Sequence, residues 1–517
     1  MIRLARLATF CLLVLASVAG CGGGGAASGG PDPATAVPAN AGIYIEGVIR
    51  PEGAARDDAL AAAGKLLGTS NPEKALKDFF NKNAKDDQDK PINWDRDISP
   101  WLGQRAGSWV ATTSESDNGF TFAIAVKDED KAKEFFERST KGGRKASYKG
   151  VDYRVSNGTA GGLSGDFLLI GTEREFKRTI DAQKGDSLGE TKRYKDAVSR
   201  LDSKRLGTFF IDPKPLIDVA LRANPAERQQ FEQFSRIFPI DKLGPIVAAF
   251  NANGQRLKID SHITGQGAET LSRFGLLSGA GSTKLLGELP GESWAAYGVP
   301  NLGQTASALF DRFAGALGGS AVAGQVQQAT GLDLRRDIFD LVGDLAIFAR
   351  GSTMADLDGA AVISVKDDAR ATEVFGKLIA LARRQGNVDP RPVRIDGADQ
   401  AFSIANPNAP KPFVAARGKG KFVFAYGEAA AKAAFQPQTR LGETELYKQA
   451  KATLDNKFEP AFLLSMDGIL KVVDGTGGGA DPDFQKARPY LERLSVITSG
   501  GKAGKNNYDA ALGVGLK

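Results

Sequence analysis

The residues that could do chemistry are few and widely separated in this chain. It has 517 residues but only one histidine, His262, and two cysteines, Cys11 and Cys21. Beyond position 21, a Cys/His metal cluster, a thiol nucleophile or a disulfide framework cannot be assembled, and a Ser-His-Asp relay would have to use His262. Carboxylates, hydroxyls, amines and backbone groups therefore remain as the only chemistry to consider.

Two serine motifs match parts of the pattern of penicillin-interacting enzymes. Ser499-Gly-Gly-Lys502 has the Ser-x-x-Lys spacing, and Ser116-Asp117-Asn118 would match the second motif. Their order is reversed, no Lys-Thr-Gly follows, and Ser499 lies in a glycine turn between strands, whereas that chemistry needs the serine at a helix start. We interpret the second motif as a hairpin turn and predict no catalytic residue in either.

Acidic clusters are the other chemistry-bearing feature. Asp481, Asp483 and Glu492 occupy the first, third and twelfth positions of a calcium loop, but the glycine at the sixth position is missing. The preceding loop, 474–481, could hold a hard cation, although a flexible insertion is the favoured interpretation. The run 86–89 is interpreted as a solvated acidic loop. We therefore expect no metal site and no cofactor.

The histidine and the tryptophans are predicted to be structural. His262 is spaced by two and four residues from Asp260 and Lys258 along a predicted strand, so the three side chains share one face. Because that face is polar, we expect His262 to be exposed. For the tryptophans, core packing is favoured over an aromatic binding patch. They are Trp94, Trp101, Trp109 and Trp294.

Residues 1–20 are predicted to be a lipoprotein signal peptide. A cationic start precedes an uncharged apolar run, Leu7 to Val18, which is too short to favour a membrane span. The sequence Val18-Ala-Gly-Cys21 resembles the lipobox of bacterial lipoproteins, in which the cysteine is acylated. We predict Cys21 as the lipidation site; a plain signal peptide with a chance cysteine is the alternative.

The residues after the signal indicate a tether to a membrane. Residues 21–37 are predicted to be the acylated cysteine followed by a flexible Gly/Ala/Pro segment. Lipid on Cys21 would hold the exported protein on the outer face of the bacterial cell membrane without a membrane span. The net charge of +6 falls to +4 when Arg3 and Arg6 leave with the signal, so we expect no nucleic-acid partner.

The chain contains an internal duplication. Residues 188–197 recur at 441–450 with seven of ten positions identical, and residues 126–136 recur at 365–375 in the same order. A weaker match pairs 97–103 with 337–343. The predicted parts are a signal peptide (1–20), a tether (21–37), a first repeat (38–265), a linker (266–285) and a second repeat (286–517).

Each repeat is predicted to have an α+β fold, a mainly antiparallel sheet with helices packed on it. Predicted strands arrive as adjacent hairpins, which favours antiparallel pairing. The closing hairpins, 243–264 and 494–516, alternate as a sheet with one covered face would. The repeated motifs themselves are interpreted as architecture instead of a duplicated active site, because Asp128 and Asp367 are placed to cap helices and Tyr194 begins a buried stripe.

These motifs together resemble the bacterial family called domain of unknown function 3352. The resemblance rests on five segments, and it is clearest in the first repeat. It implies an envelope protein that is secreted or membrane-attached, and it brings no established reaction or catalytic residue. The segments are Pro38 with Tyr44, Trp101-Leu-Gly103, the Val-Lys-Asp helix entry, Tyr148-Lys-Gly-Val-Asp-Tyr153 and the Leu-Gly-Glu-Thr-x-x-Tyr motif.

Three functions remain open from the sequence. The first is a non-catalytic binding or scaffolding lipoprotein of the cell envelope, whose partner is an envelope protein, a lipid or a polymer. The second is a carrier of a lipid or another apolar ligand, which would need a continuous apolar cavity. The third, a carboxylate-dependent hydrolase, would need two Asp or Glu residues within about 5–10 Å of each other in one cleft. The first hypothesis predicts that the protein is not an enzyme.

Replacing Cys21 tests the predicted anchor. Cys21→Ala removes the acylated thiol, so we expect the protein either to leave the membrane fraction or to stay unprocessed at the signal peptide. Membrane fractionation followed by intact-mass measurement separates these two results. Full membrane retention of a processed Cys21→Ala protein would contradict the assignment.

Overall fold

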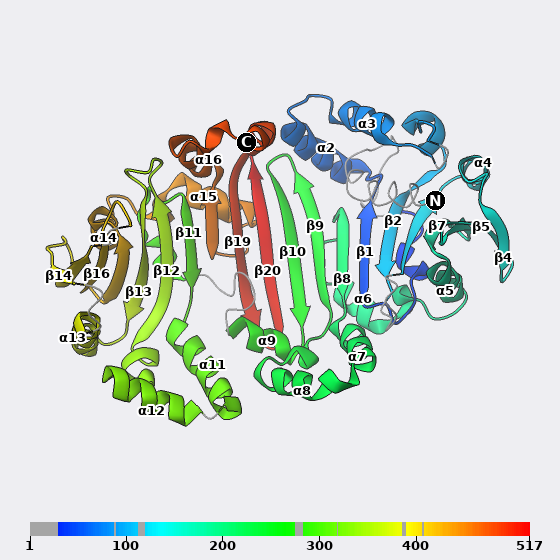
Figure 1. Ribbon diagram of the computed structural model, residues 1–517. Helices are drawn as coiled ribbons and strands as arrows, with labels where there is room; N and C mark the ends of the chain where they lie inside the picture. The colour runs from blue at the N-terminus through cyan, green and yellow to red at the C-terminus, as the bar shows by residue number, and fades with distance from the viewer. Residues whose placement is uncertain are drawn as a thin grey trace. The chain divides into compact units, whose positions relative to one another are not determined.

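The computed structural model describes residues 29–86, 89–111, 119–273, 283–317, 319–384, 389–405 and 408–517. It is 42% helix and 30% strand, with its strands paired in antiparallel fashion, which confirms the predicted α+β class (Figure 1). The chain divides into two compact units. Unit 1 comprises Met1–Phe231 and Ile240–Gly267, and unit 2 comprises Glu232–Pro239 and Ala268–Lys517. The repeat boundaries 38–265 and 286–517 stay a prediction.

Within the described residues, units 1 and 2 each contain a sheet of ten strands. In unit 1 each neighbouring pair of strands is antiparallel. The strands lie in the order β10 (Arg256–Thr264), β9 (Ile246–Asn253), β8 (Gly207–Ile211), β1 (Ile43–Val48), β2 (Leu102–Val110), β3 (Phe120–Val126), β7 (Phe167–Thr172), β6 (Thr159–Ser164), β5 (Val151–Ser156) and β4 (Arg144–Tyr148).

Unit 2 has ten strands in the same connectivity, again with antiparallel neighbours. Their order is β20 (Asn507–Leu516), β19 (Leu494–Gly504), β18 (Phe462–Ser465), β11 (Ala295–Val299), β12 (Val342–Arg350), β13 (Asp358–Val365), β17 (Lys421–Tyr426), β16 (Phe413–Gly418), β15 (Gln400–Ile404) and β14 (Arg391–Pro392).

The helices follow the strands in a matching sequence in the two units. Unit 1 has η1 (Pro33–Ala36), α2 (Gly53–Leu67), α3 (Pro72–Asn83), η2 (Trp94–Ile98), α4 (Glu129–Ser139), α5 (Glu173–Gln183), η3 (Leu188–Glu190), α6 (Lys192–Val198) and α7 (Pro213–Ala223). Unit 2 has α10 (Lys284–Gly287), α11 (Leu302–Leu317), α12 (Gly319–Thr330), η6 (Leu334–Phe339), α13 (Asp368–Arg384), α14 (Glu428–Phe435), η7 (Leu441–Glu443), α15 (Glu445–Thr453), α16 (Met466–Gly475) and α17 (Pro482–Leu491). Helix α8 (Arg228–Ile237) contains the unit boundary, and α9 (Gln266–Arg273) begins within the predicted linker.

The two predicted helix caps are confirmed. The Asp128 carboxylate accepts a hydrogen bond from the backbone N–H of Lys131 at 3.1 Å, and Asp367 does the same for Arg370 at 3.0 Å. Behind each cap the predicted apolar stripe is buried, as Ala132 and Phe375 show. The repeated residues therefore cap a helix and pack it into the core, so they have the structural role that was predicted.

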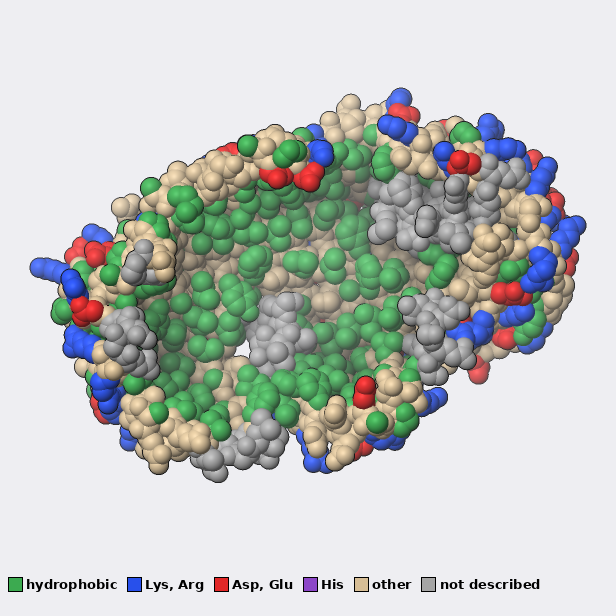
Figure 2. All heavy atoms as spheres, viewed as in Figure 1, with side chains coloured by type: hydrophobic (Ala, Val, Ile, Leu, Met, Phe, Trp, Pro, Cys, Tyr) green, Lys and Arg blue, Asp and Glu red, His purple; other side chains and the backbone are tan. Residues whose placement is uncertain are grey.

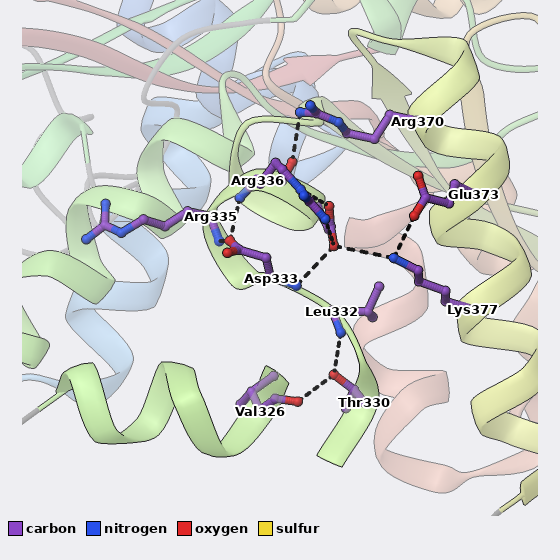
Figure 3. A network of polar contacts seen from close by, with 10 residues as sticks. Val326, Thr330, Leu332, Asp333, Arg335, Arg336, Arg370, Glu373 and Lys377 are labelled. Carbon is purple, nitrogen blue, oxygen red and sulfur yellow. Dashed lines mark hydrogen bonds and ion pairs between the residues drawn. The ribbon is translucent and has the colours of Figure 1, made fainter. Parts of the chain in front are cut away.

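An Arg–Asp turn precedes β2 in unit 1 and β12 in unit 2. In unit 2, Asp337 accepts hydrogen bonds from the backbone N–H of Asp333 at 3.0 Å and from Arg336 at 2.8 Å, while Lys377 of α13 lies 3.9 Å away (Figure 3). In unit 1, Asp97 accepts from the backbone of Asn93 at 2.8 Å and from Arg96 at 2.7 Å. Both aspartates are buried. The weak sequence match between 97–103 and 337–343 thus corresponds to the same polar turn in both units.

The structure corrects the end of the predicted tether. Residues 33–37 were expected to be flexible, but η1 packs on unit 1 with Ala34, Ala36 and Val37 fully buried. Asp32 caps η1 and lies 3.0 Å from Arg105, which also donates to Glu46 at 2.6 Å. Composition suggested a linker because small residues and proline are common there, yet the same small residues pack closely under a sheet. Signal residues 1–20, Cys21 and the tether up to residue 28 lie outside the described residues.

The Arg–Asp turn of unit 2 predicts a pH-dependent stability. The hydrogen bond from Arg336 lowers the pKa of Asp337, so its carboxylate stabilises the fold at pH values above the unfolded pKa of about 3.9. That contribution is lost as the pH falls through the lower, folded-state pKa. We expect Asp337→Asn to reduce the free energy of unfolding by about 1–3 kcal/mol at pH 7, with a smaller difference at pH 3.

Urea unfolding at several pH values measures this difference, and Asp58→Asn is the control at an exposed aspartate of α2. A loss for Asp337→Asn that is the same at pH 3 and pH 7 would contradict the assignment.

Candidate functional site: an open apolar face

In unit 2, helices cover one face of the sheet. Side chains from β12, β13 and β17 that point to this covered face are buried against α10, α14 and α15. Phe348 and Val362 are examples, and Ala430 of α14 and Leu286 of α10 are among their fully buried partners. This face supplies the main core of the unit, because it excludes water from both the strands and the helices.

The opposite face of the same strands remains open and is also apolar. Pairing registers place one residue from each of seven strands in a single transverse row, which we call the open row. It runs Phe424, Ala361, Ile347, Tyr297, Phe462, Ser499 and Leu512 from β17 to β20. Four of them keep a large exposed fraction: Phe424 and Ile347 42%, Tyr297 40% and Leu512 45%. Large apolar side chains in the middle of a sheet are therefore left in contact with water.

A second row lies beside the open row on the same face. It contains Tyr426, Gly359, Ala349, Ala295, Leu464, Ile497 and Val514, all of intermediate exposure. Neither row contains a charged residue. Seven strands about 4.8 Å apart and two rows about 7 Å apart give a surface of about 450 Å². We call these two rows the unit 2 open face.

Helices border the unit 2 open face without covering it. Helix α13 packs over Ala415 and Phe422 near one margin, through Phe375 and Val374. In the view of Figure 1, α11 and α12 lie at one end of β11 and β12, and α16 lies at the other end of β11. Figure 2 shows hydrophobic side chains gathered over these strands. The arrangement can bind an apolar molecule, but it offers no charge to a reacting group.

Polar chemistry near the face is sparse. Burial raises the pKa of Tyr508 on β20, and the nearby Tyr297 raises it further, so the Tyr508 phenol stays neutral at physiological pH. Ser499 is the one hydroxyl-bearing aliphatic side chain in the two rows. Among the described residues, no group of three or more His, Cys, Asp or Glu side chains could hold a metal ion.

Most of the motifs that the sequence suggested for chemistry lie within strands, helix caps or ion pairs of the fold. Ser499 is inside β19 and not at a helix start, and Lys502 pairs in register with Asp509 on β20. Asp481 caps α17 by accepting from the backbone of Asp483 and Phe484, while Asp474 is bound by Arg488 at 2.6 Å. The structure therefore does not bring these acids together as a cation loop. Ser116, Asp117 and Asn118 lie outside the described residues.

His262 corrects another expectation. It was predicted on an exposed strand face, but the structure buries it together with Lys258, whose ammonium lies 2.9 Å from Asp260. The alternation of polar residues along β10 suggested solvent, whereas in the structure these polar side chains are buried beside one another. The expected packing role holds for Trp94, Trp101 and Trp109, which are buried; Trp294 has intermediate exposure.

A polar pocket is another concave feature among the described residues of unit 2. It has a volume of about 660 Å³ and is formed by the segment Pro392–Phe402 with Gln436. Its charged side chains include Arg394, Asp396 and Asp399, and Asp396 pairs with Lys432 at 2.7 Å. The neighbouring charges of opposite sign neutralise one another, so the pocket shows no preference for one ligand charge.

Fold and site together define an α+β protein with an open apolar sheet face. The chain belongs to the family described as protein of unknown function (DUF3352), which matches residues 58–504 and so confirms the predicted family. No curated protein matches the chain. Crystal form I of TP0453 is similar at 11% identity and a TM-score of 0.26, covering 46% of this chain and 80% of that one. Crystal form IV gives 12% identity and a TM-score of 0.25, covering 45% and 80%.

Among the described residues, none of the helices is both long and apolar enough to span a membrane.

Proposed function

We propose that this protein is an exported, lipid-anchored envelope protein that binds the hydrocarbon part of a lipid on the unit 2 open face. The observation that carries the proposal is the open row, which crosses seven paired strands and leaves the large side chains of Phe424, Ile347, Tyr297 and Leu512 exposed to water. Of the functions left open by the sequence, the carrier of an apolar ligand is the one that this surface supports best.

The chemistry of the face favours a hydrocarbon ligand over a protein partner. A standard protein interface buries about 800 Å² on each partner and contains about one hydrogen bond per 100–200 Å². The unit 2 open face covers about 450 Å² and its residues offer few side-chain hydrogen-bonding groups. Its backbone groups are already paired within the sheet, from β17 through β20. A flexible hydrocarbon chain needs none of these groups.

The free energy gained when a ligand covers the unit 2 open face can be estimated from the exposed side chains. Fully burying a Leu, Ile or Phe side chain contributes about 1.5–3 kcal/mol. Side chains that are about 40% exposed, such as Ile347 and Phe424, therefore leave about 1 kcal/mol each for a ligand to recover. Four such residues together contribute about 4 kcal/mol, which corresponds to a dissociation constant of about 1 mM, and further burial of their half-buried neighbours would strengthen the binding.

The proposed anchor and the chemistry of the two rows also bear on the proposal. Lipid on Cys21 would keep the open face near a membrane, which is the source of such a ligand. The two rows contain no carboxylate, so the face does not support the alternative of a carboxylate-dependent hydrolase. Scaffolding of another envelope protein stays the second candidate, and it would use the same exposed surface.

Lipid content of the purified full-length chain tests the proposal. Ile347→Glu places a charge in the middle of the open row, so we expect non-covalent lipid to fall at least about tenfold, as a desolvated charge opposes hydrocarbon. Met354→Glu is the matched control, because Met354 is exposed in the loop after β12 and outside the two rows. Organic extraction with mass spectrometry quantifies the lipid, since the anchor stays attached to Cys21.

Equal lipid in the Ile347→Glu and Met354→Glu variants, or no lipid in the wild type, would contradict the proposal. Recovery of a stoichiometric envelope protein in place of lipid would also contradict it and would support scaffolding.

A further inference from the structure

We infer that unit 1 carries a second, separate site for a hydrocarbon chain, formed by its own sheet and bordered by α7. The inference rests on the proposed function, because it assigns the same class of ligand to a different surface. It is carried by residues of unit 1 alone and would hold whatever the placement of the two units.

A transverse apolar row crosses five strands of unit 1. The register from β2 to β10 aligns Val110, Ile43, Ile211, Ile246 and Ile263. Val110 and Ile211 keep 38% and 37% of their surface exposed. The five side chains are branched and aliphatic, and none of them can donate or accept a hydrogen bond. We call them the isoleucine row.

The neighbouring row on the same face is also open at its centre. Ile45 of β1 pairs with Phe209 of β8, and these side chains are 37% and 39% exposed. Tyr44, just before Ile45, and Phe210, just after Phe209, point to the other face and are fully buried. Both strands thus carry large apolar side chains on two faces. The elements η1, η3 and α6 pack against the face that contains Tyr44 and Phe210.

Helix α7 supplies the border of this site. It starts two residues after Ile211, and the Asp212 carboxylate caps it by accepting from the backbone of Lys214 at 3.1 Å. Arg193 binds the same carboxylate and so fixes the junction between β8 and α7. The cap and the ion pair hold the first turn of α7 close to Ile211, the middle residue of the isoleucine row.

The composition of α7 fits contact with hydrocarbon. Its polar residues Lys214, Asp218 and Arg222 are four apart and form one narrow stripe, and the rest of the helix is apolar. A helix with so wide an apolar surface is normally buried, yet α7 has no buried residue. Half-exposed side chains such as Leu216 and Val219 are therefore available to a ligand lying along the row.

The size of the surface decides which occupant fits. Five strands about 4.8 Å apart and two rows about 7 Å apart span about 340 Å², well under the roughly 800 Å² per partner of a standard protein interface. A second copy of the chain would gain too little contact and would find no side-chain hydrogen bonds in the isoleucine row. A single hydrocarbon chain matches both its area and its chemistry.

Binding of a defined probe distinguishes the two faces. The delipidated full-length chain is titrated with the fluorescent polyene fatty acid cis-parinaric acid, and the bound probe per chain is measured. We expect Phe209→Glu to lower the bound probe by about half, Ile347→Glu to lower it by a similar share, and the double variant to abolish binding. Phe79→Glu is the matched control, because Phe79 is exposed on α3 of unit 1.

The outcomes separate this inference from the proposed function. Wild-type stoichiometry in Phe209→Glu, with loss only in Ile347→Glu, would overturn the unit 1 site and leave the unit 2 site standing. No probe bound to the wild type would overturn both. If Phe209→Glu fails to fold by circular dichroism, Ile45→Thr keeps a strand-forming residue and should still reduce binding. A wild-type dimer in light scattering that Phe209→Glu dissociates would assign the face to a second copy and overturn the inference.

Discussion

Helices of unit 2 cover one face of a sheet whose central strands are apolar on both faces. The covered face, with side chains such as Phe348 and Val362, gives the unit its core and stabilises it whether or not a ligand is present. The other face leaves Ile347, Tyr297 and Phe424 exposed to water, which costs free energy in the unbound state. A ligand that covers the open face recovers that cost, so this asymmetry between the two faces favours binding.

Such a face must be held flat and open without helices on it, and the polar turns and ion pairs contribute to that. The Arg–Asp turns at Asp97 and Asp337 fix the entrance to β2 and β12 through buried hydrogen bonds. In unit 1, Arg105 joins Glu46 on β1 to Asp32 of the N-terminal segment. Burial raises the pKa of Glu46 against the opposing charge of Arg105, so this ion pair carries a desolvation cost. Glu46 lies on the covered face of unit 1, together with the buried Tyr44.

Much of the architecture could be predicted from the sequence because it depends on local patterns. Hairpin-like succession of strands gave the antiparallel α+β class, and the caps at Asp128 and Asp367 followed from a single residue before each helix. The end of the tether could not be predicted, because the burial of Ala34 and Ala36 depends on a sheet that is remote in sequence. The predicted exposure of His262 was wrong for a similar reason. The alternation of residues along a strand identifies which side chains share a face, but it does not show what covers that face.

The open face could not be predicted either, because a strand pattern does not show which face the helices cover. A strand such as Gly207–Ile211, with Phe209 and Phe210 adjacent, is apolar on both sides, and that pattern normally indicates burial on both sides. Only the three-dimensional position of η1, η3 and α6 shows that one side of this strand remains open. The signal was therefore present in the sequence as doubly apolar strands, but the ligand-binding interpretation required the packing of the helices.

Photolabelling of the full-length chain with a diazirine-bearing fatty acid tests the central claim most directly. The label inserts where the hydrocarbon lies, and peptide mass spectrometry locates the modified residues. The account predicts adducts on peptides that contain Tyr297, Ile347 or Phe424, suppressed by excess unlabelled fatty acid. Adducts confined to other surfaces, or labelling that excess fatty acid does not suppress, would contradict the claim that the open face binds lipid.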